Sequence, residues 1–183
     1  TASGGSGYPG TVYTPIGGGA DDTANLQAIL NGFEAAGGGE LIIAGRCYVT
    51  GLTYRGGNLT IRGLYASSQF ALYGCGFTNT STSTTTLDFS TAGLSTPALT
   101  NQNILVQDLV FYASNAMTGG WAIKGGTTFS CSSIVRCTVF GSNYGYPGGH
   151  KNGVYLGMGC QDVSMNKTFV WMCPGSGIET EGY

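Results

Sequence analysis

Apolar residues near the start of the chain recur with the spacing of an α-helix. The members of this set are Leu26, Ile29, Leu30 and Phe33. They would share one face of a helix, which indicates an amphipathic element of a few turns. Asp21 and Asp22 precede it, where a helix start favours acceptors and negative charge. Three glycines at 37–39 end the helical pattern. The short apolar run Leu41–Ile43 that follows has no helical period and indicates a strand.

The second half of the chain repeats a strand pattern. Three segments read alike, at residues 103–112, 133–141 and 162–171, and an earlier copy lies at 58–65. Ile104, Ile134 and Val163 align between the three segments. Each segment is followed by a variable loop and a second strand bounded by glycines, at 120–125, 153–157 and 177–182. A period of about 20–30 residues built from strands is typical of a solenoid, and we predict a parallel β-helix.

This pattern divides the chain into successive parts. Residues 1–14 are expected to form a flexible leader or linker, and residues 15–51 the N-terminal cap helix with the first coil. Residues 52–183 then form the β-helix coils, with a Thr-rich excursion at about 69–100 that breaks the period. The sequence stops in or just after a strand, so we expect that the polypeptide continues or that another chain covers this end.

The capping region resembles a known family. Asp21-Asp22-Thr23, the helix, the glycine-rich turn and Gly45-Arg46-Cys47-Tyr48 follow the N-terminal pattern of pectate-lyase-like right-handed parallel β-helices, of the phage tail-spike and depolymerase type. Ala44 departs from the pattern, which often has proline there. The resemblance covers about residues 12–51 by motif. It implies an all-β, right-handed, single-stranded parallel β-helix with a short capping α-helix. It also implies an extracellular or virion location, a homotrimer or larger assembly, and a polysaccharide partner.

Composition narrows the function classes further. Only 9% of the 183 residues are charged and the formal net charge is −2, so nothing indicates binding to nucleic acid. The sequence has no apolar run of the length that a membrane span requires. One histidine and no Cys-x-x-Cys pair argue against a zinc site, and a dense acidic cluster for calcium is lacking. No metal or cofactor is therefore predicted.

The six cysteines leave two interpretations open. An even number suits disulfides in an extracellular protein, whereas the alternative is a set of small buried apolar residues. In the repeat alignment Cys131 and Cys160 each lie three residues before a matched position, Ile134 and Val163. Equivalent positions on adjacent coils would be within reach of a disulfide, so Cys131 and Cys160 are the candidate pair.

Candidate chemistry lies on the last strand. Glu179 and Glu181 are two residues apart, so both should point outward, with carboxylates about 6–7 Å apart. Tyr155 should lie beside Glu179 one coil earlier, with Lys124 on the coil before that. Paired carboxylates at such a spacing serve in glycosidic cleavage, which makes the glutamates candidate catalytic residues. Two solvated acids would have the same spacing. Tyr144, Tyr146 and His150, in a glycine-rich loop, are further candidates for sugar binding or ordinary loop packing.

Three functions remain open. The first is a β-helix that binds polysaccharide and, as a glycoside hydrolase or polysaccharide lyase, cleaves it. The second is a structural or adhesin β-helix of a virion appendage or fibre, without catalysis. The third is a secreted pectin-degrading enzyme, although the acid and base motifs of that family are not recognisable here. Fold alone does not decide between them, and the enzyme assignment stays open.

Overall fold

The computed structural model describes residues 10–65, 74–90, 103–126, 129–142, 148–157, 160 and 162–181. These contain one helix, α1 (Thr23–Ala36), and sixteen short strands. The strands are β1 (Gly10–Tyr13), β2 (Gly39–Ile43), β3 (Arg46–Val49), β4 (Leu52–Thr53), β5 (Leu59–Gly63), β6 (Gly76–Asn79), β7 (Leu87–Phe89), β8 (Leu105–Gln107), β9 (Val110–Ala113), β10 (Trp121–Gly125), β11 (Ser133–Val135), β12 (Thr138–Phe140), β13 (Asn152–Leu156), β14 (Ser164–Asn166), β15 (Phe169–Trp171) and β16 (Ile178–Thr180).

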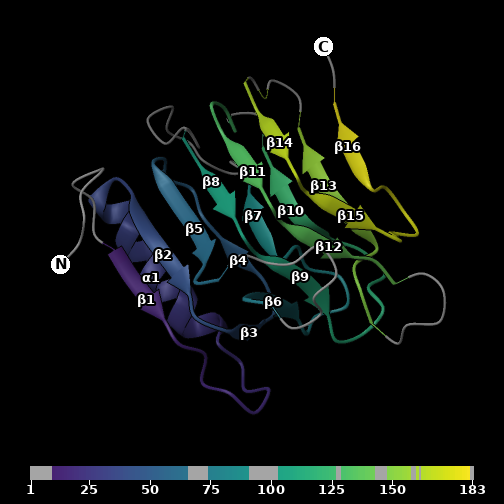
Figure 1. Cartoon of the computed structure of the whole chain (residues 1–183), viewed down its shortest axis with the longest axis horizontal. Coiled ribbons are helices and arrows are strands. Elements are labelled where there is room, and N and C mark those ends of the chain that lie inside the picture. The colour runs from purple at the N-terminus through teal and green to yellow at the C-terminus, as the bar shows by residue number, and fades with distance from the viewer. Residues whose placement is uncertain are drawn as a thin grey trace.

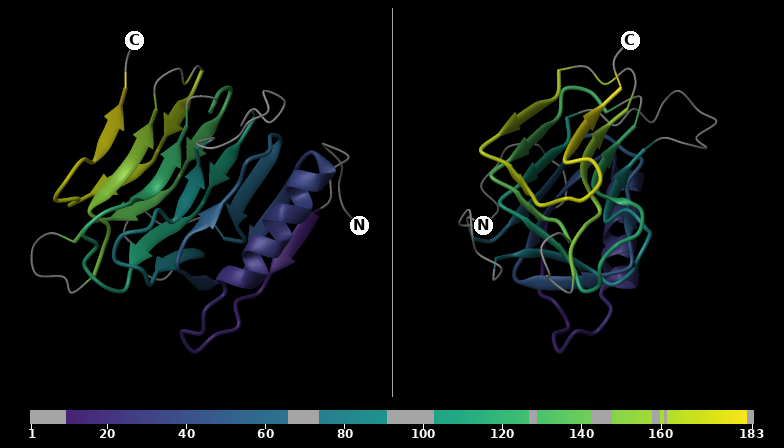
Figure 2. Two further views of the ribbon diagram at one scale, coloured as in Figure 1. Left: turned by 180° about the vertical axis from the view of Figure 1, so that it is seen from behind. Right: turned by 90° about the vertical axis from the view of Figure 1, so that its right-hand side faces the viewer.

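The strands form three parallel sheets, which confirms the predicted parallel β-helix. Sheet A has the order β1-β2-β5-β8-β11-β14, sheet B the order β3-β6-β9-β12-β15, and sheet C the order β4-β7-β10-β13-β16. From β2 onward each coil contributes one strand to each sheet in turn, so successive coils stack as a solenoid (Figure 1). The view along the stack shows the coils behind one another, with the last coil nearest the viewer (Figure 2, right).

The core consists of inward-pointing side chains that stack from coil to coil. In sheet A the row is Leu41, Ile61, Val106, Ile134 and Met165. In sheet B it is Cys47, Phe77, Phe111, Val139 and Val170, and in sheet C it is Leu52, Leu87, Ile123, Val154 and Ile178. Most of these side chains are fully buried. The rows explain why short, β-branched and aromatic segments recur: each must match the residue above and below it.

The cap helix α1 lies at the β1–β2 end of the stack, as Figures 1 and 2 show. Leu26, Leu30 and Phe33 form its buried face. The helix ends at Gly37, whose φ of 81° is left-handed and whose N–H donates to the Glu34 carbonyl. Glycine adopts that conformation without steric cost, which is why the helix stops there.

Asp22 holds the cap to the first coil. Its carboxylate is fully buried and accepts hydrogen bonds from the Tyr13 hydroxyl (2.7 Å), the Ile16 N–H (3.0 Å) and the Tyr48 N–H (3.0 Å). Burial, followed by the bond to Asp22, raises the pKa of Tyr13 to about 12. Helix capping falls instead to Asp21, which accepts from the Thr23 N–H at 2.8 Å. The two adjacent aspartates therefore do different work, because only Asp22 points into the protein.

Two predicted segment boundaries are wrong. Residues 10–13, assigned to a flexible leader, form β1 and pair with β2 through the register Val12↔Ile42. Residues 74–90, assigned to the Thr-rich excursion, supply β6 and β7 to the second coil. Polar groups of this segment bond to one another within the protein: Asn79 Nδ2 donates to the Thr86 hydroxyl (2.8 Å) and to the Thr84 carbonyl (3.0 Å). Residues 66–73 and 91–102 lie outside the described residues.

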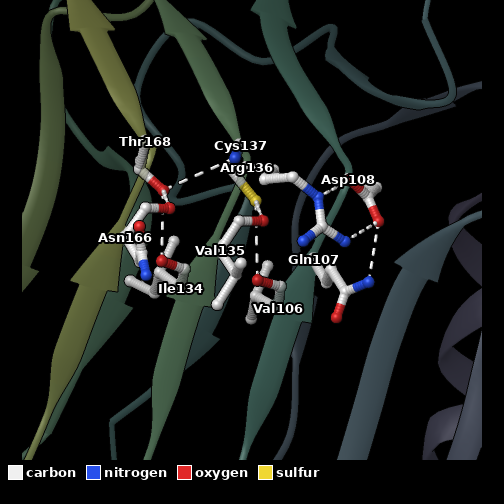
Figure 3. A network of polar contacts seen from close by, with 9 residues as sticks. All are labelled: Val106, Gln107, Asp108, Ile134, Val135, Arg136, Cys137, Asn166 and Thr168. Carbon is white, nitrogen blue, oxygen red and sulfur yellow. Dashed lines mark hydrogen bonds and ion pairs between the residues drawn. The ribbon is translucent and has the colours of Figure 1, made fainter. Parts of the chain in front are cut away.

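The turn between sheets A and B repeats in three successive coils. Asp108, Arg136 and Lys167 occupy it with φ values of 55°, 50° and 50°. Arg136 donates two hydrogen bonds of 2.7 Å to the Asp108 carboxylate, and this contact is the main reason that the pKa of Asp108 is lowered (Figure 3). In the next layer the Thr168 hydroxyl donates to the Ile134 carbonyl at 3.1 Å. These side-chain contacts add to the backbone hydrogen bonds between the same turns, which the Asp108 and Arg136 N–H groups donate to the Val135 and Asn166 carbonyls.

The predicted disulfide between Cys131 and Cys160 is also wrong. Both cysteines are free, and Cys160 Sγ donates to the Gly126 carbonyl at 3.0 Å. The repeat alignment paired Ile134 with Val163, whereas the structure pairs Ile134 with Met165. This shift of two residues places Cys160 and Cys131 at different positions of their coils.

Candidate functional site

A row of polar side chains runs across the outer surface of sheet C. Its register joins Thr53, Asp88, Lys124, Tyr155 and Glu179, one from each strand of the sheet. The residues that flank them along the strands are buried in β7 and β10, so the row is the outward side of an alternating pattern. We call the surface made by Asp88, Trp121, Lys124, Tyr155, Glu179 and Glu181 the sheet C face. Strands β10, β13 and β16, which carry most of it, lie side by side in Figure 1.

The predicted neighbours Lys124, Tyr155 and Glu179 are therefore brought together. Tyr155 pairs directly with Glu179 on one side, as the repeat of glycine-bounded strands indicated, and with Lys124, which was expected nearby, on the other. The Lys124 ammonium lies 5.9 Å from the centre of the Tyr155 ring. This distance allows a cation–π contact between the Lys124 ammonium and the Tyr155 ring.

Trp121 adds an aromatic side chain that the sequence reasoning missed. Its ring centre lies 5.2 Å from that of Tyr155, with the two planes inclined by 43°. Both side chains are partly exposed. Trp121 stands at the start of the same glycine-bounded strand as Lys124, and that position was the available signal. The two rings give the face a broad apolar surface between its charged groups.

Each glutamate has its own hydrogen-bond donor. The Ser176 hydroxyl donates to Glu179 Oε2 at 2.6 Å. The Tyr155 hydroxyl bonds to the Glu181 side chain, and this bond is the main cause that raises the pKa of Tyr155 to about 12. The phenol therefore stays protonated near neutral pH and acts as a donor. Glu179 and Glu181 are both exposed, so solvent or a ligand can reach their remaining acceptor positions.

Of the two interpretations of His150, sugar binding and ordinary loop packing, its burial favours packing. The side chain is fully buried, and burial lowers its pKa to about 3, against a smaller opposite effect from the Tyr112 backbone. Neither ring nitrogen has a hydrogen bond of good geometry. Isolated bridges pair the backbone of His150 with Gly141 and that of Gly149 with Ala116. Tyr144 and Tyr146, the other two loop candidates, lie outside the described residues.

Neither a metal centre nor a membrane helix is found in the part of the chain that the structure describes. No three His, Cys, Asp or Glu side chains there are grouped so that they could hold a metal ion. The one helix in this part is not long and apolar enough to cross a membrane.

Comparisons with protein-family models, with curated proteins and with solved structures found no match for this chain. The resemblance to pectate-lyase-like β-helices therefore rests on the capping motif, and membership in that family stays a prediction. The chemistry of the sheet C face has to be argued from its own residues. It offers two adjacent aromatic rings, one ammonium and several carboxylates on an open surface of a rigid stack.

Proposed function

We propose that the chain binds polysaccharide through the sheet C face. The observation that carries this proposal is the Trp121–Tyr155 ring pair at 5.2 Å, with Lys124 and Glu179 in register beside Tyr155. A sugar ring has apolar C–H faces and a rim of hydroxyls. Aromatic rings accept the faces, and carboxylates accept hydrogen bonds from the hydroxyls.

The layout favours a polymer over a single sugar. Neighbouring strands in a sheet are about 4.8 Å apart, so the outward row spans several such steps from Asp88 to Glu179. Because the strands belong to stacked coils, the backbone holds these groups at fixed intervals. A chain of sugars laid along the row would meet successive strands without requiring a deep pocket.

Cleavage is the second candidate function, and it concerns Glu179 and Glu181. Their different donors, Ser176 and Tyr155, give the two carboxylates distinct environments, as an acid and a base require. Their exposure favours binding instead, because a general acid is usually created by burying one carboxyl group. A face that binds glycan without cutting it corresponds to the adhesin or structural alternative.

Binding is tested by titrating the purified chain with a panel of oligosaccharides by calorimetry. Trp121→Ala should weaken binding at least tenfold, because stacking aromatics are dominant contacts in such interfaces. Phe169→Ala is the matched control, since Phe169 is an exposed aromatic residue on sheet B. Equal affinity in the wild type and Trp121→Ala would place binding elsewhere. Product release from the same samples, lost in Glu179→Gln, would add cleavage.

The resemblance also supports an extracellular or virion-associated homotrimer, which we include in the proposal. Light scattering of the intact polypeptide tests it. A trimeric mass supports the tail-spike-like arrangement, whereas a monomer contradicts that part of the proposal and leaves the sheet C face as the binding surface of a single chain.

A further inference from the structure

The charges of the sheet C face are distributed unevenly along it. Asp88 and Lys124 are direct neighbours in the register, so one end of the face carries one residue of each charge. At the other end are Glu179 and Glu181, and neither forms an ion pair within the described residues. Tyr155 separates the two ends. A ligand stacked on Tyr155 would thus meet no net charge on the side of Asp88 and Lys124, and net negative charge on the side of Glu179 and Glu181.

Hydrogen bonding at the Glu179–Glu181 end leaves mainly acceptors free. Ser176 and Tyr155 donate to the two glutamates, so the protein has already contributed its donors there. What remains open to solvent is a set of carboxylate acceptors, each of which can accept further bonds. The best complement is a group that donates several hydrogen bonds and carries positive charge, because charge-assisted bonds are the stronger ones. An added carboxylate on the ligand would instead be repelled.

On the basis of the proposed polysaccharide-binding function, we propose that the β16 end of the sheet C face selects a glycan carrying protonated amino sugars over a polyuronate. A sugar stacked on Tyr155 would have its neighbour about one strand spacing, roughly 4.8 Å, further along, beside Glu179. An amine on that neighbour would lie among the glutamate oxygens. The uronate carboxylates of a pectate-like polymer would face the same oxygens.

The test compares three oligosaccharides of equal length with the intact chain: oligoglucosamine, its fully N-acetylated counterpart and oligogalacturonate. Calorimetric titrations are run at about pH 6, above the pKa range of ordinary carboxyl groups, at low and high salt. We expect oligoglucosamine to bind at least fivefold more tightly than its N-acetylated counterpart at low salt, with the difference shrinking at high salt. We expect oligogalacturonate to bind least.

Charge-neutral variants assign the preference to its residues. The double variant Glu179→Gln with Glu181→Gln should lose the preference for the amine while it still binds the N-acetylated oligosaccharide. Asp162→Asn is the matched control, because Asp162 is an exposed carboxylate outside sheet C, and it should keep the preference. Trp121→Ala should weaken all three ligands equally.

The outcomes separate this inference from the function on which it rests. Oligogalacturonate binding as tightly as oligoglucosamine would overturn the inference and retain polysaccharide binding. A preference that survives the double glutamate variant would also overturn it, by placing selection elsewhere. Binding of none of the three oligosaccharides, together with none of the wider panel, would refute the proposed function itself.

Discussion

His150 should make the stability of the fold depend on pH in a range where few other side chains titrate. It is the chain's one histidine and is fully buried, with a pKa near 3. In the unfolded chain its pKa returns to about 6.5. The unfolded state therefore binds a proton that the folded state does not, and stability is full above about pH 6.5 and falls as pH falls towards 3. Between about pH 8 and about pH 5 these pKa values remove about 2 kcal/mol of unfolding free energy.

The assay is urea unfolding followed by circular dichroism at half-unit steps over that range. His150→Leu and His150→Gln remove the titrating group, so each should flatten the curve between about pH 8 and about pH 5, whatever its absolute stability. The slope is the readout because either variant changes packing as well. A wild-type curve that is already flat would refute the reasoning, since it would mean that the folded ring accepts a proton at little cost. A slope that persists in both variants would assign the effect to another group.

Three further predictions concern residues that hold the stack together. Asp22→Asn should lower the unfolding free energy by about 2 kcal/mol, because the amide –NH2 of asparagine would face hydrogen-bond donors. Asp21→Asn is the control: its amide oxygen can still accept from the Thr23 N–H, so the unfolding free energy in the same urea titration should change little. Asp108 has a lowered pKa, so its contribution is present above the unfolded value of about 3.9 and is lost below it; Asp108→Asn should reduce the loss of stability in acid titrations below about pH 4. Cys131→Asn should raise the unfolding free energy by about 0.5–1 kcal/mol, because φ is 49° there and asparagine tolerates that region better; a lower unfolding free energy in the same titration would contradict this.

The periodic parts of the fold were predictable from the sequence because each coil must match the next. The helical spacing before Gly37 and the strand repeats identified the cap and the solenoid. The exact alignment in sheet A was not predictable, since its strands of alternating apolar residues look alike when shifted by two. Such a shift returns each side chain to the same face, so the core assignment survived while the partner of Ile134 changed from Val163 to Met165. The disulfide expectation depended on the exact partner and failed for that reason.

Sheet C shows why part of the candidate site could be predicted and part could not. Gly153 and Gly177 stand at the same level of β13 and β16, so the pairing of Tyr155 with Glu179 followed from the sequence. Gly120 stands two residues out of that alignment, so the glycines alone did not fix Lys124 as the partner of Tyr155. The side-chain directions of Trp121 and His150 could not be predicted in this way, because each residue lies next to a bend of the chain. The Trp121 ring packs against Tyr155 rather than against its direct register partner Asn152, and the His150 ring is buried although its segment is rich in glycine. The sequence repeat thus specifies which residues share a row. Next to the bends between strands, tertiary contacts decide the side-chain direction, and they produce the Trp121–Tyr155 contact on which the proposed binding depends.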